Sequence, residues 1–138
     1  MLKRPCPEIP RTYRNNGQHA QQRAESALLG TISKADNIPH TAGADFLHYQ
    51  VKSARATICQ GLDIAQYLAE DRAKAFIYVA STEWLYIMDK AEYIAFCLTF
   101  ATVTKESAKN GGQVKMRLKH ETKALLDYLE SHTTNGEG

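Results

Sequence analysis

Two dense apolar runs in the middle of the chain constrain its fold more than any other feature. Residues 74 to 80 read KAFIYVA and residues 84 to 88 read WLYIM, and only the tripeptide Ser81-Thr82-Glu83 separates them. Both runs have the length of a strand and are rich in aromatic and aliphatic side chains. A polar linker of three residues is typical of a tight turn. The sequence therefore predicts a β-hairpin whose side chains belong mostly to the core.

Helical patterns and shorter strand patterns surround this hairpin. Apolar residues recur at helical spacing in residues 17 to 30, where Gly30 ends the pattern. Further helices are expected at residues 64 to 70, from Asp89 to about Phe100, and at 120 to 131. Further strands are expected at residues 46 to 54, with a continuation past a bend at 56 to 59, and around 114 to 118, after a polar loop that begins at residue 104. This order predicts an α/β (α+β) domain with a small mixed β-sheet flanked by helices.

The two ends of the chain differ from this pattern. Residues 1 to 15 carry three prolines and four basic side chains, which predicts an irregular basic arm. Residues 16 to 132 are expected to form a single domain, and residues 133 to 138 a disordered tail. A chain of 138 residues is long enough to bury a core of its own.

Composition and motifs limit the possible classes of function. The net charge of +2 neither requires nor opposes a nucleic-acid partner. Three widely spaced cysteines without a CxxC pair indicate a reduced, cytoplasmic protein. No apolar segment has the length of a signal peptide or a membrane span, so no membrane partner is expected. Neither GxGxxG nor a Walker-type loop occurs, so no nucleotide cofactor is expected.

The segment from residue 43 to 55, GADFLHYQVKSAR, carries the polar groups that indicate chemistry. Side chains two positions apart share a face of a strand, so Gln50 and Lys52 point one way and Tyr49 and Val51 the other. Asp45 lies where a loop enters this strand. A two-faced strand of this kind can bury its apolar side and present its polar side to a cleft.

This combination fits phosphodiester hydrolysis assisted by Mg²⁺, for which Mn²⁺ is the expected substitute. Mg²⁺ prefers oxygen ligands and keeps several waters. Asp45, the amide oxygen of Gln50 and the backbone carbonyl of Val51 are the candidate ligands. Lys52 is the candidate catalytic cation, beside the attacking water and the phosphate. In the alternative without a catalytic site, Asp45 is a turn residue, and Gln50 and Lys52 form the solvent-exposed face of an edge strand.

The segment resembles the restriction-endonuclease-like, or PD-(D/E)XK, nuclease superfamily in its variant with Gln in place of Glu. The matching residues are Ala44-Asp45 and Gln50-Val51-Lys52. The resemblance implies a restriction-endonuclease-like core and a DNA endonuclease of nicking, restriction or mobile-element type, including phage proteins. It also implies an accessory side chain from the preceding helix, either Glu25 or Gln21.

The pattern departs from the superfamily in two respects, and these leave an alternative open. No proline precedes Asp45, and the interval from Asp45 to Gln50 is short for a complete hairpin. The short interval places Asp45 at a bend in the same strand, and Asp36 is then a second candidate for the upstream position.

DNA contacts are expected from basic side chains outside this segment, because each cation near a phosphate adds salt-dependent affinity. The candidates are Arg55, Lys105, Lys109, Lys115, Arg117 and Lys119. A homodimer is a further expectation, because Phe76 and Tyr78 need a cover and because small enzymes that cut both strands generally pair. Two other functions remain open: a catalytically inactive DNA-binding protein on the same fold, and a protein–protein adaptor or inhibitor that uses the aromatic hairpin.

Overall fold

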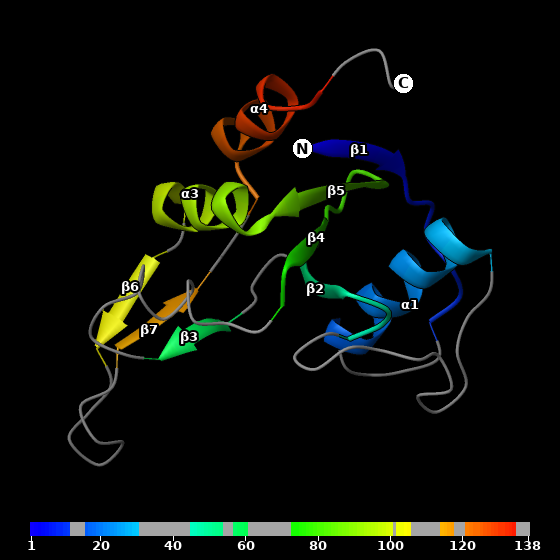
Figure 1. Ribbon diagram of the computed structural model, residues 1–138, viewed down its shortest axis with the longest axis horizontal. Coiled ribbons are helices and arrows are strands. Elements are labelled where there is room, and N and C mark those ends of the chain that lie inside the picture. Colours follow the sequence, from blue (N-terminus) through cyan, green and yellow to red (C-terminus); the bar gives the residue numbers. More distant parts are fainter. Residues whose placement is uncertain are drawn as a thin grey trace.

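The computed structural model describes residues 1–11, 16–30, 45–53, 57–60, 73–100, 102–105, 114–117 and 121–134. Its strands form two sheets (Figure 1). The four-stranded sheet has the order β1 (Leu2–Pro5), β5 (Trp84–Asp89), β4 (Ala75–Val79) and β2 (Tyr49–Ser53). The three-stranded sheet has the order β3 (Thr57–Gln60), β7 (Val114–Arg117) and β6 (Thr102–Lys105). The helices are α1 (Asn16–Leu29), α3 (Lys90–Phe100) and α4 (Lys123–Ser131).

The predicted hairpin forms the middle of the four-stranded sheet. β4 and β5 pair antiparallel, and the turn between them is closed by the Ala80 N–H donating to the Trp84 carbonyl at 3.0 Å. β1 pairs antiparallel with β5, whereas β2 pairs parallel with β4. The sheet is therefore mixed, and the predicted α+β class with helices beside a mixed sheet is confirmed.

Helices cover both faces of this sheet. On one face, Phe76 and Tyr78 pack with residues of α3 and α4, and the Phe76 ring stacks on Tyr93 with centroids 4.1 Å apart. On the other face, Ile77 and Val79 pack with Ala20, Ala24 and other residues. Figure 1 shows α1 on the opposite side of β4 and β5 from α3 and α4. The expectation that Phe76 and Tyr78 need a partner subunit as cover is wrong, because the chain's own helices cover them.

Local end signals of the helices were predicted well. Asp89 precedes α3, and its Oδ1 accepts from the Glu92 N–H at 2.7 Å while Glu92 Oε1 accepts from the Asp89 N–H at 3.0 Å. This reciprocal pair is a capping box. Gly30 follows α1 at φ +71°, a conformation that glycine adopts without steric cost. α4 begins three residues later than expected, because the Thr122 hydroxyl caps it.

The expectation of an irregular arm is wrong for Leu2–Pro5, which form β1. Met1 and Cys6, on either side of this strand, are buried. The Lys3 ammonium makes two interactions: an ion pair with Glu130 at 2.6 Å and a cation–π contact with the Trp84 ring, 4.0 Å from its centroid. β1 is an end strand of the described sheet, and such a position tolerates proline. Tertiary contacts therefore order a segment that its own sequence predicts to be irregular.

Two further expectations need correction. Residues 102–105 form strand β6, although a polar loop was expected from residue 104. Residues 57–60 pair with β7 in the second sheet instead of continuing β2. The expected helix at 64 to 70 and most of the expected polar loop lie outside the described residues.

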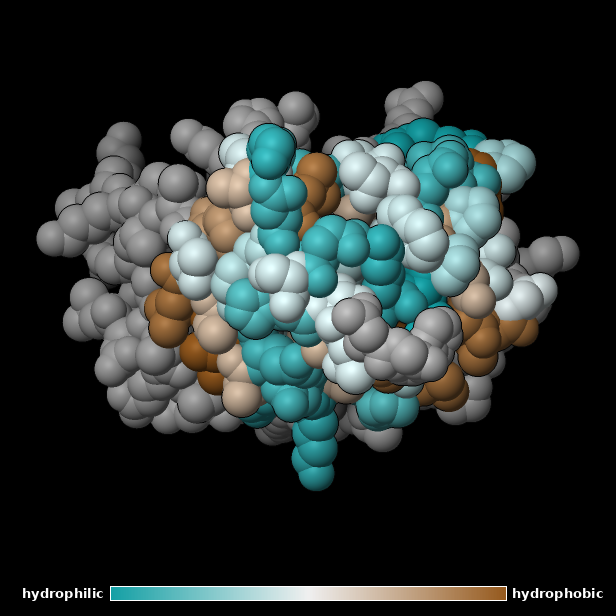
Figure 2. Space-filling view, turned by 90° about the horizontal axis from the view of Figure 1, so that it is seen from above, coloured by the Kyte–Doolittle hydropathy of each residue, from teal (hydrophilic) through white to brown (hydrophobic). Residues whose placement is uncertain are grey.

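The surface and the helices add two observations. Figure 2 shows a face on which hydrophilic side chains predominate across the middle and hydrophobic side chains form separate patches. None of the helices in the described part of the chain is long and apolar enough to cross a membrane.

Candidate functional site

Asp45 lies in a tight turn that folds back on the beginning of β2. The Asp45 N–H donates to the Tyr49 carbonyl at 2.8 Å, and the Tyr49 N–H donates to the Phe46 carbonyl at 2.9 Å. Leu47 has φ +49°, in the left-handed region, and Phe46 is fully buried. The strand therefore begins at Tyr49 and not at Phe46. Asp45 occupies a bend ahead of the strand, and Asp36, the second candidate for the upstream position, lies outside the described residues.

The Asp45 carboxylate lies at the outer edge of β2. Its Oδ2 accepts from the Val51 N–H at 2.7 Å. The Val51 N–H thus points away from β4, and the carbonyl of the same strand residue points to the same side. Within the described residues, β2 is the last strand of its sheet. A carboxylate and a backbone carbonyl consequently share one sheet edge.

Helix α1 carries a second carboxylate, which one side chain links to the Asp45 turn. Gln21 and Glu25 are one helical turn apart, and Glu25 is fully buried. The Gln21 amide donates to Glu25 Oε2 at 3.0 Å and to the Asp45 carbonyl at 3.3 Å. Gln21 therefore joins the helix to the turn, and Glu25 lies one side chain away from Asp45.

Gln50 and Lys52 lie on the other face of β2. In the parallel register Gln50 is beside Phe76 and Lys52 beside Tyr78, both of which face α3 and α4. Tyr49 and Val51 pack in the core on the α1 side. The predicted alternation along the strand is confirmed. The structure thus joins the Asp45 carboxylate to the Val51 N–H and links Glu25 to the Asp45 carbonyl through Gln21, and it places the side chains of Gln50 and Lys52 on the opposite face.

The amide oxygen of Gln50 is buried and has no hydrogen-bond partner among the described residues. A buried oxygen without a donor costs free energy, so this group is a candidate for an interaction with a cation or a donor that binds there. Its own face of the sheet, however, is not that of Glu25.

The oxygen donors of Asp45, Glu25 and the Val51 carbonyl are of the type that Mg²⁺ takes as ligands. Two carboxylates and a carbonyl are the hard donors that Mg²⁺ prefers, and the ion completes its coordination with water. Within the described residues, no group of three His, Cys, Asp or Glu side chains could hold a metal ion. A site built from Asp45, Glu25 and the Val51 carbonyl falls outside that class, because one of its ligands is a backbone group.

The predicted DNA-contacting residues lie elsewhere, as far as they are described. Lys105 ends β6, and Lys115 and Arg117 alternate along β7, where they pair in register with Thr104 and Thr102. Arg55, Lys109 and Lys119 lie outside the described residues.

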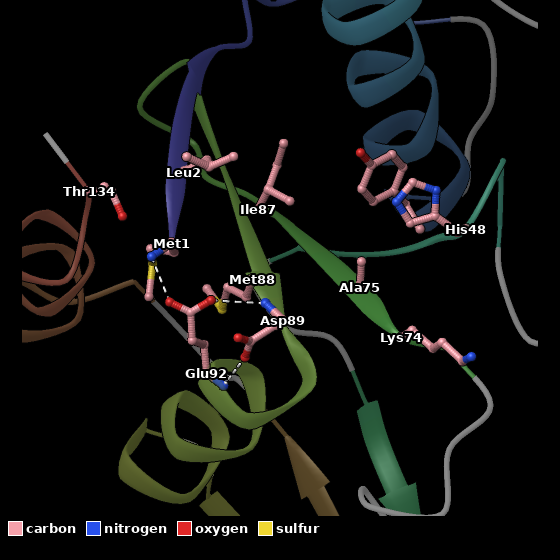
Figure 3. Close-up of a pocket in the computed structure, with 11 residues that line it drawn as sticks. Met1, Leu2, His48, Lys74, Ala75, Ile87, Met88, Asp89, Glu92 and Thr134 are labelled. Atoms are coloured by element: carbon pink, nitrogen blue, oxygen red, sulfur yellow. Dashed lines mark hydrogen bonds and ion pairs between the residues drawn. The ribbon is translucent and has the colours of Figure 1, made fainter. Parts of the chain in front are cut away.

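A hollow of about 390 Å³ at one end of the four-stranded sheet was not predicted (Figure 3). It is lined by residues of all four strands and their flanks, including His48, Lys74, Ile87 and Asp89. These residues are far apart in the sequence and form no motif. Their proximity follows from the order of the strands in the sheet, which the sequence did not predict.

No protein-family model, curated protein or solved structure matches this chain.

Proposed function

We propose that the chain is a Mg²⁺-dependent DNA endonuclease that hydrolyses phosphodiester bonds. The observation that carries this proposal is the gathering of oxygen donors at the outer edge of β2. Asp45 Oδ2 is held 2.7 Å from the Val51 nitrogen, and Gln21 links the Asp45 turn to the buried carboxylate of Glu25. Asp45, Glu25 and the Val51 carbonyl would hold the cation, which supplies charge neutralisation and acidifies a bound water.

Gln50 and Lys52 would act from the other side of the same strand. Because β2 ends the described sheet, side chains from either face can reach its outer edge. The proposal assigns to the Lys52 ammonium the stabilisation of charge on the phosphate. It assigns to the unpartnered Gln50 oxygen a supporting interaction with the cation or its water. The basic residues of β6 and β7 would hold the DNA backbone.

Cleavage of supercoiled plasmid in Mg²⁺ or Mn²⁺, with EDTA as the blank, tests this proposal. Asp45→Asn is the informative variant, because the asparagine Oδ1 can still accept from the Val51 N–H while the charge is lost. Glu25→Gln and Lys52→Met complete the set. Asp127→Asn is the matched control, since Asp127 is exposed on α4 and pairs with Lys123. We expect Asp45→Asn and Lys52→Met to reduce cleavage about 100-fold or more, and Asp127→Asn to leave it unchanged.

Metal-dependent cleavage that survives both Asp45→Asn and Lys52→Met would refute the assignment. Retardation of the plasmid without cleavage, unaffected by EDTA and weakened by salt, would indicate the inactive DNA-binding alternative. Absence of DNA affinity at moderate salt would favour the adaptor alternative. Binding of Mn²⁺ measured by electron paramagnetic resonance gives a readout that does not depend on turnover, and Asp45→Asn should weaken it.

A further inference from the structure

The hollow at the end of the four-stranded sheet has an apolar floor. Leu2 of β1 is paired in register with Ile87 of β5, and Ala75 of β4 with Tyr49 of β2. Ile87 and Tyr49 belong to the face that α1 covers, at the margin of its buried cluster. Figure 3 shows Leu2, Ile87 and Ala75 along the hollow, and Tyr49 also lines it. Half-buried apolar side chains from four neighbouring strands thus line one side of the hollow.

Polar groups of opposite kind stand at the two ends of this floor. Lys74 and His48, both exposed, lie at one end, and the His48 ring lies against Tyr49 with centroids 4.0 Å apart. Asp89 and Glu92 lie at the other end. Glu92 is engaged with the Met1 ammonium at 2.6 Å, and one oxygen of Asp89 caps α3. The second oxygen of Asp89 can accept a further hydrogen bond.

We propose that this hollow binds one nucleotide unit, a nucleobase joined through its sugar to a phosphate. A planar base can lie on the apolar floor beside the His48 and Tyr49 rings. The Lys74 ammonium, with His48 as a second donor, meets the phosphate. The Asp89 carboxylate accepts from N–H groups on the far edge of the base. The hollow lies near the lower end of the range for small-ligand sites, about 300 to 1000 Å³, which fits a single unit and not a duplex.

The unit can come from a free nucleotide or from a DNA strand, and the two sources share this chemistry. Tyr49 is hydrogen-bonded through its carbonyl to the Asp45 N–H, so a bound nucleotide lies next to the turn that carries Asp45. The DNA source rests on the proposed function. Binding of the nucleotide itself does not, because no residue of the hollow needs a metal for these contacts.

Chemical-shift titration of the ¹⁵N-labelled full chain in EDTA tests the inference. The probes are dAMP, adenosine, inorganic phosphate and a single-stranded oligo-deoxyadenylate. We expect dAMP or the oligonucleotide to shift the amides of His48, Tyr49 and Ala75 in a saturable manner. Adenosine lacks the phosphate and inorganic phosphate lacks the nucleoside, so each should bind with an affinity at least about tenfold lower. Saturation by the oligonucleotide alone assigns the site to a strand, and saturation by dAMP assigns it to the free nucleotide as well.

The variant Lys74→Gln should weaken binding about tenfold, and it should fold normally because Lys74 is exposed. Lys123→Gln, an exposed position at the beginning of α4, is the matched control and should bind as the unmodified chain does. Equal affinity for phosphate and dAMP, no change in Lys74→Gln, or no shift in the hollow with any probe would each overturn the inference. Nucleotide binding without plasmid cleavage would overturn the proposed function alone. Plasmid cleavage without nucleotide binding would overturn this inference alone.

Discussion

Replacement of Arg23 by Met tests how the segment that follows β1 is fastened to the domain. Arg23 is buried, with 7% of its surface exposed. Its Nη2 donates to the Cys6 carbonyl at 2.6 Å and its Nη1 to the Ala80 carbonyl at 3.3 Å. One side chain of α1 thus links the N-terminal segment to the end of β4. Without it, we expect this part of the chain to detach more readily.

The loss of stability can be worked from these contacts. A hydrogen bond that involves a charged group contributes about 1.5 to 3 kcal/mol, and the longer contact to Ala80 belongs at the low end of that range. Methionine keeps much of the aliphatic volume, so the cavity contribution is small. Removing the guanidinium also removes its own desolvation cost, which offsets part of the loss. We therefore expect Arg23→Met to lower the free energy of unfolding by about 2 to 4 kcal/mol.

Urea unfolding with two probes measures this effect. Trp84 is the only tryptophan of the chain and pairs in register with Pro5 of β1, so its fluorescence reports on the docking of β1. Far-ultraviolet circular dichroism reports on the domain as a whole. Arg4→Met is the matched control, because Arg4 lies within β1 and its guanidinium donates to the carbonyl of the adjacent residue Lys3 at 3.0 Å. We expect this control to change the stability by less than about 0.5 kcal/mol.

A loss of less than about 1 kcal/mol in Arg23→Met, or a loss equal to that in Arg4→Met, would refute the reasoning. The two probes then add a second criterion. If β1 is held mainly through Arg23, the fluorescence transition of the variant should occur at lower urea than the dichroism transition. Coincident transitions with a large loss would mean that Arg23 supports the whole domain and not this segment in particular.

Three further predictions concern the core, a helix end and the response to acid. Phe96→Ala, at a fully buried position between α3 and the sheet, should cost about 3 to 5 kcal/mol in urea unfolding, and a cost below 1 kcal/mol would contradict the packing described. Thr122→Ala removes the hydroxyl that accepts from the Leu125 N–H at 3.1 Å and should cost about 1 kcal/mol, whereas Thr122→Ser should restore most of it. The hydrogen bond from Lys3 lowers the pKa of Glu130 below the ordinary 4.5, so the stability it contributes is present above that pH and lost as the pH falls through the folded-state pKa. Glu130→Gln should therefore weaken the decline of the urea midpoint between pH 5 and 3, and an unchanged decline would rule this contribution out.

The sequence predicted those elements whose signals are local. The β4–β5 hairpin follows from two apolar runs and their short linker, and the start of α3 follows from Asp89. It did not predict β1, because Leu2–Pro5 has little strand propensity of its own and is ordered by Arg23, Glu130 and the edge of β5. Nor did it predict that β3 leaves the sheet of β2, because strand partners far apart in the chain are chosen by tertiary packing.

The candidate site also has features that the sequence predicted and features that depend on tertiary packing. Alternation along β2 correctly separated Gln50 and Lys52 from Tyr49 and Val51, since the period of a strand is fixed by its geometry. Which of these two faces meets α1 is a property of the packing, and α1 lies on the side of Val51. Glu25 is therefore linked through Gln21 to the Asp45 turn, on the face of the sheet opposite Lys52. The nucleotide-sized hollow depends even more on packing, because four strands contribute to it.

Asp45 has a structural reason to occupy its position whether or not the edge of β2 binds a cation. An end strand exposes N–H groups that can pair with another chain, and the Asp45 carboxylate satisfies one of them, on Val51. A neutral amide satisfies that N–H nearly as well, whereas a divalent cation needs the negative charge. Asp45→Asn consequently separates the two roles. Equal stability with loss of Mn²⁺ binding indicates a cation site, and equal stability with equal binding leaves only the protected strand edge.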